Sequence, residues 1–459
     1  MGSLSYSHFV IFPFLSQGHT IPLLYLSRLL RRRSVVVTLF TTAGNSPSIR
    51  ASLQDIDVSI IELPLPHNID GVSTGVENTD KLSVGSSFLP FARATEHMKE
   101  SFEEALETLQ PPVSCVVSDS FLWWTLKSAQ KIGVPRLGFF GMGNFSATMY
   151  QILGRFRPHA GVDSVDEPFP MTHFPEVKLT RNDFDPPFGD FNSSGPFVDF
   201  IIDCGIALAT SKGLIVNSFH ELESRYVDYW NKNLGPKAWN IGPLCLAAEI
   251  SKSENASYLQ WVDEKREKKE PVLYVSFGTQ AEISPEQFLE IAQGLERSGV
   301  SFLWALKYKD LNFLPEFESR IKGRGLVAEE WVDQLKILQH EGVKGFLSHC
   351  GWNSVIESIS AGVPILAMPF MAEQHNARFV AEEVGVGLRI MPRNGSVRGF
   401  VAAAEVEMKV RELMGGGKVA EEVRKRVAEC GGAAHAAMKE GGSSWRTLDL
   451  LLHNLVPKK

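Results

Sequence analysis

The sequence predicts an α/β protein with two doubly wound domains, each built on a parallel sheet. Short, continuously apolar runs alternate with amphipathic helical segments, which is typical of parallel strands covered by helices on both faces. The alternation occurs in two successive series along 459 residues, a length that suits two domains of about 200 residues each. Polar, aromatic and glycine residues follow the strands of both series. Because ligands of such sheets bind beyond the carboxyl ends of the strands, we expect one cleft between two facing domains.

The expected strands follow one another at short intervals in each series. In the first series they are Phe9–Phe14, Val35–Thr41, Val58–Leu63, Val113–Ser118, Arg136–Phe140 and Gly213–Asn217. In the second they are Val272–Ser276, Phe302–Leu306, Gly325–Ala328, Val343–Leu347, Pro364–Met368 and Gly387–Ile390. Helical periodicity is clearest in Ile21–Leu30, Pro285–Ser298 and Val355–Ala361. The proline-rich stretch Pro168–Pro187 is predicted to be a long loop with little helix.

Breaks in the pattern indicate where the domains end. Ile241-Gly242-Pro243 ends a strand-like piece, and small and polar residues follow it. We therefore expect a first domain over residues 1–243, a linker over 244–256 and a second domain over 257–444. Gly441-Gly442-Ser443-Ser444 interrupts the last helices, and the apolar stretch Trp445–Leu455 after it requires a place to be buried.

Composition and charge exclude several classes of protein. The net charge is −7, which argues against a nucleic-acid surface, and Arg31-Arg32-Arg33 suits the C-terminal end of a helix. The five cysteines are odd in number and widely spaced, so neither a disulfide framework nor a zinc site is expected. The N-terminus does not resemble a signal peptide, and no apolar run reaches the length of a membrane span. We expect a cytoplasmic monomer without stable membrane insertion.

Among the segments that follow the expected strands, the one around His349 says most about function. A strand turns there through Gly351 into a helix that begins near Asn353 and Ser354. Unpaired N–H groups and the helix dipole make such a start an anion site, suited to a diphosphate. Glu357 lies on the same helix face and could accept hydrogen bonds from two vicinal hydroxyls, as on a ribose. The alternative is that Asn353 and Ser354 are ordinary helix caps and that Glu357 is solvated.

One segment, from residue 331 to residue 374, resembles the signature box of plant family-1 UDP-glycosyltransferases without a gap. The residues that carry the resemblance are Trp331, Gln334, Ile337, Leu338, His340, Ser348-His349-Cys350-Gly351-Trp352-Asn353-Ser354, Glu357, Gly362-Val363-Pro364, Pro369 and Glu373-Gln374. The resemblance implies two facing Rossmann-like domains of the GT-B type, with the acceptor bound mainly by the first and UDP-sugar by the second. It also implies that a C-terminal helix over residues 445–459 packs back on the first domain.

The resemblance implies the residues that hold the donor. These are Thr279, Trp331, Val332, Gln334, His349, Gly351, Trp352, Asn353, Ser354, Glu357, Glu373 and Gln374. Trp331 would stack on uracil while the main chain of Val332 reads the base edge. Gln334 and Glu357 would hold the ribose. The diphosphate would contact His349, Asn353, Ser354 and Thr279.

The remaining donor residues bear on the choice of sugar. Trp352, Glu373 and Gln374 would hold the sugar hydroxyls, and Trp352 with Gln374 is similar to the pattern of glucose users. Many members have Asp where this chain has Glu373, and we expect the longer carboxylate to keep the role with a different reach. UDP-glucose is then the expected co-substrate, and we expect neither a cofactor nor a metal.

His19 and Asp119 are the expected catalytic residues, because each follows a strand of the first domain. Transfer of a sugar to a hydroxyl requires a base, and a neutral imidazole serves at cytosolic pH. A carboxylate on the other ring nitrogen would fix the tautomer and stabilise the imidazolium. The resemblance implies a single in-line displacement with inversion at the anomeric carbon. The helix start near Asn353, rather than a metal, would meet the charge on the leaving diphosphate.

The acceptor is expected to be small and hydrophobic, such as a flavonoid or other phenolic, with transfer to a hydroxyl or to an aromatic carbon. The candidate residues around it are Phe121, Phe140, Met142, Phe145 and Phe188. Gly141 and Gly143 follow a strand and would leave room for the acceptor. Packing of a helix on the sheet is the alternative reason for these glycines.

Two other functions have to be weighed. Gly141-Met142-Gly143 is similar to the start of a dinucleotide fingerprint, which would suit an NAD(P)-dependent two-domain oxidoreductase, but Ser146 replaces its third glycine. A non-catalytic UDP-sugar-binding protein would not need His19 and Asp119. Asp55-Ile56-Asp57 and Asp183-Phe184-Asp185 have the D-x-D shape of metal-dependent transferases, but neither follows a core strand, so we expect turns or surface positions.

Overall fold

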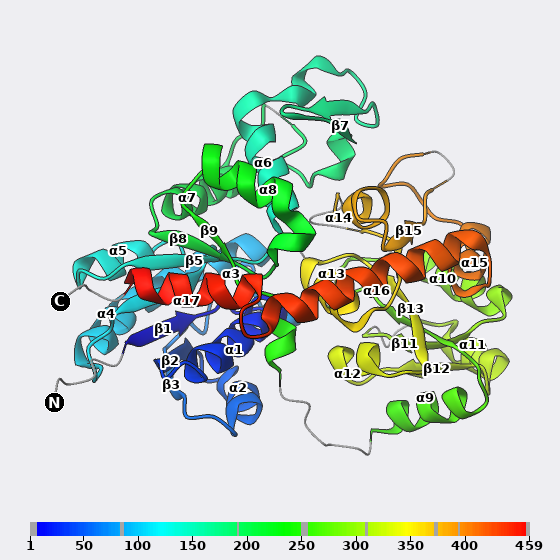
Figure 1. Ribbon diagram of the computed structural model, residues 1–459, viewed down its shortest axis with the longest axis horizontal. Coiled ribbons are helices and arrows are strands. Elements are labelled where there is room, and N and C mark those ends of the chain that lie inside the picture. The colour runs from blue at the N-terminus through cyan, green and yellow to red at the C-terminus, as the bar shows by residue number, and fades with distance from the viewer. Residues whose placement is uncertain are drawn as a thin grey trace. The chain divides into compact units, whose positions relative to one another are not determined.

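The computed structural model describes residues 7–82, 87–190, 192–248, 256–307, 311–370, 375–392 and 395–455. The chain forms two compact units (Figure 1). The first unit comprises Met1–Asn144, Ser193–Ala248 and Ala436–Lys459. The second comprises Phe145–Asn192 and Glu249–His435.

The first unit is built on a seven-stranded sheet with the order β3-β2-β1-β4-β5-β8-β9. All its neighbouring strands are parallel. The strands are β1 (His8–Phe12), β2 (Val36–Thr41), β3 (Ser59–Glu62), β4 (Cys115–Asp119), β5 (Arg136–Phe140), β8 (Gly213–Val216) and β9 (Ala238–Asn240). The helices are α1 (Gln17–Arg31), α2 (Ser46–Leu53), α3 (Phe88–Ala94), α4 (Lys99–Thr108), α5 (Thr125–Lys131), α7 (Pro196–Ala209), α8 (His220–Asn233) and α17 (Ser443–Leu455).

Both faces of the central strand β1 are buried, which explains why all of its residues after His8 are apolar. In β1, Phe9 and Ile11 pack with α1, α2 and α17, whereas Val10 and Phe12 pack with α3, α4, α5 and α7. Successive side chains of a strand point to opposite faces, so a strand between two helix layers needs an apolar residue at every position.

The second unit has a six-stranded parallel sheet with the order β12-β11-β10-β13-β14-β15. The strands are β10 (Val272–Ser276), β11 (Ser301–Ala305), β12 (Gly325–Ala328), β13 (Val343–Ser348), β14 (Ile365–Ala367) and β15 (Gly387–Arg389). The helices are α6 (Asn144–Phe156), whose first residue belongs to the first unit, α9 (Ser257–Glu267), α10 (Pro285–Ser298), α11 (Leu314–Ile321), α12 (Gln334–Gln339), α13 (Trp352–Ala361), α14 (Asn376–Arg378), α15 (Ala403–Met414) and α16 (Lys418–Met438), whose last residues belong to the first unit.

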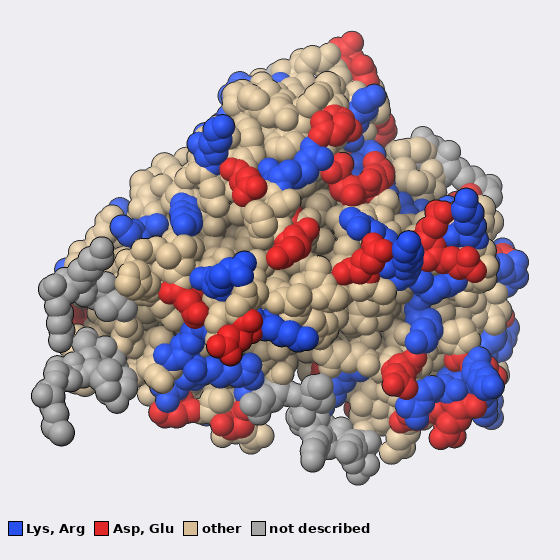
Figure 2. All heavy atoms as spheres, viewed as in Figure 1, with Lys and Arg blue, Asp and Glu red and all other residues tan. Residues whose placement is uncertain are grey.

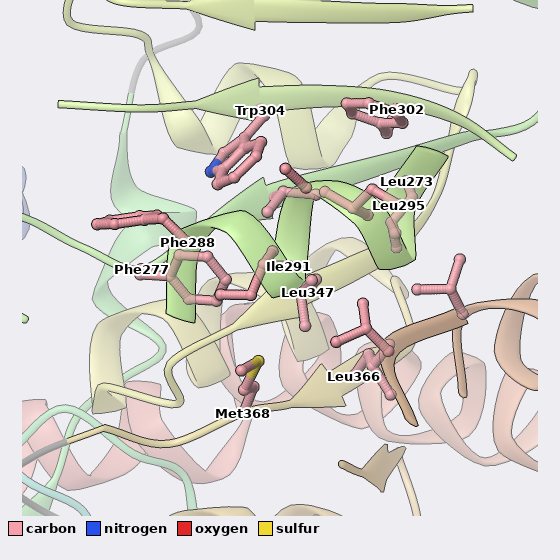
Figure 3. Close-up of a cluster of buried hydrophobic side chains, with 14 of the residues drawn as sticks. Leu273, Phe277, Phe288, Ile291, Leu295, Phe302, Trp304, Leu347, Leu366 and Met368 are labelled. Carbon is pink, nitrogen blue, oxygen red and sulfur yellow. The ribbon is translucent and has the colours of Figure 1, made fainter. Parts of the chain in front are cut away.

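One helix shows how sequence signals produce the core of the second unit. Ser284 caps α10 by accepting a hydrogen bond from the N–H of Gln287, and Gly299 follows its end with a φ of 74°. The apolar face of α10 packs on the sheet (Figure 3). The labelled core residues are Leu273, Phe277, Phe288, Ile291, Leu295, Phe302, Trp304, Leu347, Leu366 and Met368. Burial of each large apolar side chain contributes about 1.5–3 kcal/mol.

The expected strands all occur, within one or two residues at their ends. The long loop expected over Pro168–Pro187 is wrong in part, because β6 (Phe169–Met171) and β7 (Phe174–Leu179) form an antiparallel hairpin there. Proline is tolerated in edge strands, and both strands of a two-stranded sheet are edges. The prolines of this stretch are therefore compatible with a hairpin, although they suggested a loop.

The units differ from the expected domain boundaries at two places. The stretch Phe145–Asn192 packs with the second unit, although we expected it within a first domain of residues 1–243. The reason is specific contact, since Phe145 stacks on Phe379 with ring centroids 4.9 Å apart. The chain also rejoins the first unit at Ala436 rather than at residue 445, because Met438 packs against the core of that unit.

The D-x-D segments are structural. Asp55 and Asp57 bind Arg28 and Arg31 of α1. Asp183 lies in a short 3₁₀ turn (Arg181–Asp183), as the turn alternative predicted, but it is fully buried rather than on the surface, and its carboxylate binds Arg378 at 3.0 Å.

Basic and acidic side chains are interspersed on the face in Figure 2. All five cysteines are free and buried. In the described part of the chain, no helix combines the length and the apolar character needed to cross a membrane.

Candidate active site

His19 and Asp119 are in direct contact in the first unit. His19 lies in the first turn of α1, directly after β1, and Asp119 ends the neighbouring strand β4. The parallel register pairs Phe12 with Ser118, so both strands end at the same edge of the sheet. The Nδ1 of His19 lies 2.6 Å from Oδ2 of Asp119. The structure therefore brings together two residues that lie a hundred positions apart.

The environment of Asp119 determines what the imidazole can do. The carboxylate side chain has 0% exposure, and its Oδ1 accepts a hydrogen bond from the N–H of Phe121 at 2.9 Å. An ionised carboxylate can only accept, so Nδ1 of His19 is the donor. A neutral ring then carries its lone pair on Nε2, which is the arrangement of a general base.

Aromatic rings and one glycine surround the His19 imidazole. Its ring centroid lies 5.7 Å from Phe14 and 5.3 Å from Phe121. A Cβ atom at Gly141 would lie 3.3 Å from Cε1 of His19. Gly141 thus leaves room for the imidazole of His19. This role differs from the packing of a helix on the sheet, which was the alternative reason for the glycine. Phe14 and Phe88, which contact Phe121, were not predicted; the position of Phe14 just beyond β1 was the available signal.

The expected acceptor residues are divided between the two units. Phe121, Phe140 and Met142 are half-buried in the first unit. Phe188 belongs to the second unit and packs on Tyr150, with centroids 4.9 Å apart. Phe145 is fully buried, and the contact with the acceptor expected for it stays a prediction. It lies in the first turn of α6, from which it stacks on Phe379.

The turn between β13 and α13 forms the centre of the expected donor site. Cys350 has a φ of 65°, a left-handed conformation that is uncommon for a residue with a side chain. Its N–H donates to Oγ of Ser348 at 3.1 Å. Gly351 then serves as the N-cap of α13, and no side chain caps this helix start. The positive end of the helix dipole is therefore available to an anion.

His349 is held between two glycines beside this helix start. A Cβ atom at Gly278 or Gly351 would lie 2.9 Å or 2.5 Å from Nε2 of His349. Burial lowers the pKa of His349 to about 4, against the smaller effect of a main-chain hydrogen bond to Ser276. The imidazole is therefore neutral at neutral pH and can donate one hydrogen bond without carrying charge.

Gln334, Ser354 and Glu357 form a buried hydrogen-bonded cluster. Nε2 of Gln334 donates to Oε2 of Glu357 at 2.8 Å and to Oγ of Ser354 at 3.1 Å. Glu357 is only 7% exposed, so the alternative of a solvated glutamate is wrong. Burial raises the pKa of Glu357 to about 7, although the hydrogen bond from Gln334 opposes this effect.

The other expected donor residues have varied environments. Trp331 is 73% exposed, and Val332 beside it is buried in the core. Thr279 is exposed, and its carbonyl accepts a hydrogen bond from Lys307 at 3.2 Å. The indole of Trp352 is buried, 6.1 Å from the ring of Phe379. Glu373 and Gln374 lie outside the described residues.

Within the described ranges, no group of three or more His, Cys, Asp and Glu side chains is arranged to hold a metal ion.

Comparison with known proteins places this geometry in a family. Residues 223–411 match the family model described as UDP-glucoronosyl and UDP-glucosyl transferase. The chain is 46% identical to UDP-glycosyltransferase 90A1 of Arabidopsis thaliana, over 100% of this chain and 98% of the relative. It is 34% identical to UDP-glucose flavonoid 3-O-glucosyltransferase 7 of Fragaria ananassa, over 98% and 96%.

A solved structure extends the similarity to the whole fold. The crystal structure of UGT73P12 of Glycyrrhiza uralensis, complexed with glycyrrhetinic acid 3-O-monoglucuronide, matches with a TM-score of 0.90 and 30% identity. The match covers 98% of this chain and 96% of that one. A likeness that spans both units argues against the oxidoreductase alternative. The chain belongs to the plant UDP-glycosyltransferase family and is a glycosyltransferase enzyme with two Rossmann-like domains.

Proposed function

We propose that this enzyme transfers glucose from UDP-glucose to a hydroxyl of a small hydrophobic acceptor, such as a flavonoid or other phenolic, with inversion at the anomeric carbon and without a metal. The observation that carries the proposal is the 2.6 Å contact between His19 and the fully buried carboxylate of Asp119. The similarity to UDP-glucose flavonoid 3-O-glucosyltransferase 7 of Fragaria ananassa supports both the donor and the acceptor class.

The proposed reaction is a single displacement. Nε2 of His19 removes the acceptor proton while the acceptor oxygen attacks the anomeric carbon opposite the leaving group. One C–O bond forms, the bond to the β-phosphate oxygen breaks, and UDP leaves with the electron pair. Asp119 holds Nδ1–H and stabilises the imidazolium that forms. A positioned base of this kind contributes about 10²- to 10⁴-fold to the rate.

The donor would be held by the second unit. Trp331 offers an exposed ring for the uracil, and the cluster of Gln334 and Glu357 suits the ribose hydroxyls. The diphosphate would lie at the start of α13, where the helix dipole favours an anion, in contact with Asn353, Ser354 and Thr279. His349 would lie beside the leaving group as a neutral imidazole, and the preorganised dipole at the start of α13 would stabilise the developing charge without a metal. Glu373 and Gln374 stay predicted ligands of the glucose hydroxyls.

The central test separates binding from chemistry. We expect His19→Ala to retain UDP binding and to lose transfer by about 10³-fold or more. The matched control is His97→Ala, which removes an exposed histidine of the same unit and should leave turnover unchanged. The assay is a screen of phenolic acceptors with UDP-glucose, detected by mass spectrometry, with the product anomer assigned by NMR.

Several outcomes would contradict parts of the proposal. Full activity of His19→Ala removes the base role. An α-linked product excludes inversion, and loss of activity in a chelator excludes metal independence. Comparable turnover of UDP-galactose and UDP-glucose excludes the preference for glucose.

A further inference from the structure

Asn376 is a fully buried amide that links two distant parts of the second unit. It begins α14, and its Nδ2 donates to the main-chain carbonyl of Cys350 at 3.2 Å. Its Oδ1 accepts a hydrogen bond from Oγ of Ser146 at 2.6 Å. Ser146 lies in α6 and is also fully buried. The side chain therefore connects α6 to the turn that precedes α13.

The carbonyl that Asn376 binds belongs to the left-handed residue of that turn. Side chains hold the main chain of Cys350 on both sides, since Ser348 accepts its N–H and Asn376 donates to its C=O. A residue with a Cβ atom disfavours the left-handed conformation, so the surrounding contacts must maintain it. Gly351, the next residue, is the N-cap of α13. The orientation of Cys350 thus decides where the start of α13 points.

Ser146 determines which way the amide of Asn376 faces. If the amide were rotated by half a turn, its oxygen would face the carbonyl of Cys350, and two acceptors would repel each other. The hydroxyl of Ser146 donates to Oδ1 and so favours the orientation that places Nδ2 on Cys350. Ser146 occupies the place of the third glycine in the incomplete dinucleotide pattern, which explains why a polar residue stands there.

The neighbours of Asn376 hold it in place. The ring of His375 lies 5.7 Å from Phe145, 5.2 Å from Tyr150 and 5.2 Å from Phe184. On the other side, Arg378 binds the buried carboxylate of Asp183. With ring contacts before it and an ion pair after it, Asn376 has little freedom to follow a shift of the turn.

We propose that Asn376 is a positioning residue for the donor, acting through Cys350 and itself oriented by Ser146. The inference rests on the proposed binding of the UDP diphosphate at the start of α13. Asn376 does not touch the donor in this account. It keeps the first turn of α13 aimed at the diphosphate, so its loss weakens UDP binding more than acceptor binding.

The decisive variant is Asn376→Asp, which keeps the size of the side chain and the acceptor for Ser146. It replaces the donor to Cys350 with a second acceptor, so the turn must move. We expect the Kd of UDP, measured by titration calorimetry, to rise about tenfold, the range seen when a positioning hydrogen bond behind a ligand is lost. The acceptor KM should change less than the Kd of UDP, because Asn376 acts on the start of α13, which belongs to the donor site in this proposal.

A matched control distinguishes positioning from general loss of stability. Gln287 is a buried amide of the same unit whose side chain makes two hydrogen bonds with the main chain of Val401. Gln287→Glu therefore makes the same chemical change away from the β13–α13 turn. It should lower the melting temperature while the Kd of UDP stays unchanged.

A milder pair of variants keeps the test valid if Asn376→Asp fails to fold. Ser146→Ala removes only the hydroxyl that orients the amide and should raise the Kd of UDP about threefold. Its control is Ser298→Ala, which removes a buried hydroxyl bonded to the carbonyl of Leu295 and should leave the Kd unchanged. If the wild type binds UDP and each variant has the same Kd of UDP as its control, the positioning role of Asn376 is overturned. If the wild type itself does not bind UDP, the proposed donor site is what fails.

Discussion

The buried carboxyl group of Glu357 makes the stability of the folded protein depend on pH. Its neighbours within hydrogen-bonding distance are neutral, and Asp333 nearby adds a repulsive charge. The unfolded chain has the ordinary pKa of 4.5, and burial raises it to about 7 in the folded protein. The folded state therefore binds this proton more tightly. The free energy of unfolding falls as pH rises from 4.5 to about 7, by on the order of 3 kcal/mol, and is level above that pH.

This pKa leads to a prediction about UDP binding. Ribose hydroxyls donate hydrogen bonds, which favour the ionised carboxylate, so binding of UDP has to release the proton of Glu357 below pH 7. We expect the affinity for UDP to rise about tenfold between pH 6 and pH 8. Titration calorimetry across this range measures the change.

Glu357→Gln provides the control for this prediction. The amide does not titrate, so its UDP affinity should lack the part of the pH dependence that Glu357 causes. Ionisation of the diphosphate itself affects both proteins equally. The same pH profile in both would show that Glu357 does not face the ribose.

At the scale of elements, the β13–α13 turn depends on close approach to His349. Gly351 has a φ of −55°, which any residue can adopt. Its lack of a side chain is needed for a different reason, because a Cβ atom would overlap Nε2 of His349 at 2.5 Å. The neighbouring turn after β10 needs Gly278 twice over, since a φ of 73° and the same imidazole both exclude a side chain.

We predict that Gly351→Ala weakens UDP binding by more than about tenfold, because the imidazole or the turn has to move. The expected loss comes from the overlap of the new Cβ atom with the His349 imidazole and not from backbone strain. It therefore tests whether the position of His349 matters for UDP binding. Thermal stabilisation by UDP measures it directly.

Gly432→Ala is the matched comparison. Gly432 lies inside α16, and a Cβ atom there meets nothing within 4 Å. Alanine should stabilise the helix by about 0.5–1 kcal/mol and leave UDP binding unchanged. Normal UDP binding by Gly351→Ala would mean that His349 does not contribute to the donor site.

At the scale of the whole molecule, the end of the chain completes the core of its beginning. Leu448, Leu451 and Leu455 of α17 pack in the same core layer as α1 and β1. Arg33 stacks on Trp445 at 4.0 Å and binds Asp449 at 2.7 Å. Contacts between residues this far apart in the chain require the second unit to be synthesised before the first is complete.

We predict that Leu451→Ala, which truncates a side chain only 2% exposed, destabilises the first unit by about 2–5 kcal/mol. Hydrogen exchange measured by mass spectrometry should show faster exchange in β1 and β2 and unchanged exchange in β10 and β13. The control is Leu450→Ala one residue away, whose side chain is 48% exposed and whose cost should stay within about 0.5 kcal/mol. Equal effects of the two variants would contradict the packing of α17.

The sequence alone determined the fold class and the family. Continuous apolar strands predicted parallel sheets because burial on both faces leaves no other pattern, and the structure confirms them. The segment from Trp331 to Gln374 indicated the family because its residues are close in the chain. His19 and Asp119 were identified because each follows a strand, which is also a local signal. From the sequence, their contact could only be inferred, because both follow strands that end at the same edge of a sheet. The structure shows the contact directly, since β1 lies beside β4 in the sheet.

Only the tertiary structure decided which side chains face one another across the chain. It buried Phe145 and the indole of Trp352, which the sequence suggested for ligand contacts, and it joined Asn376 to Ser146 across a separation of 230 residues. It also placed Phe145–Asn192 with the second unit. The physical reason is that strand and helix patterns are set by neighbouring residues, whereas the partner of a buried polar or aromatic group is set by which distant elements pack against it.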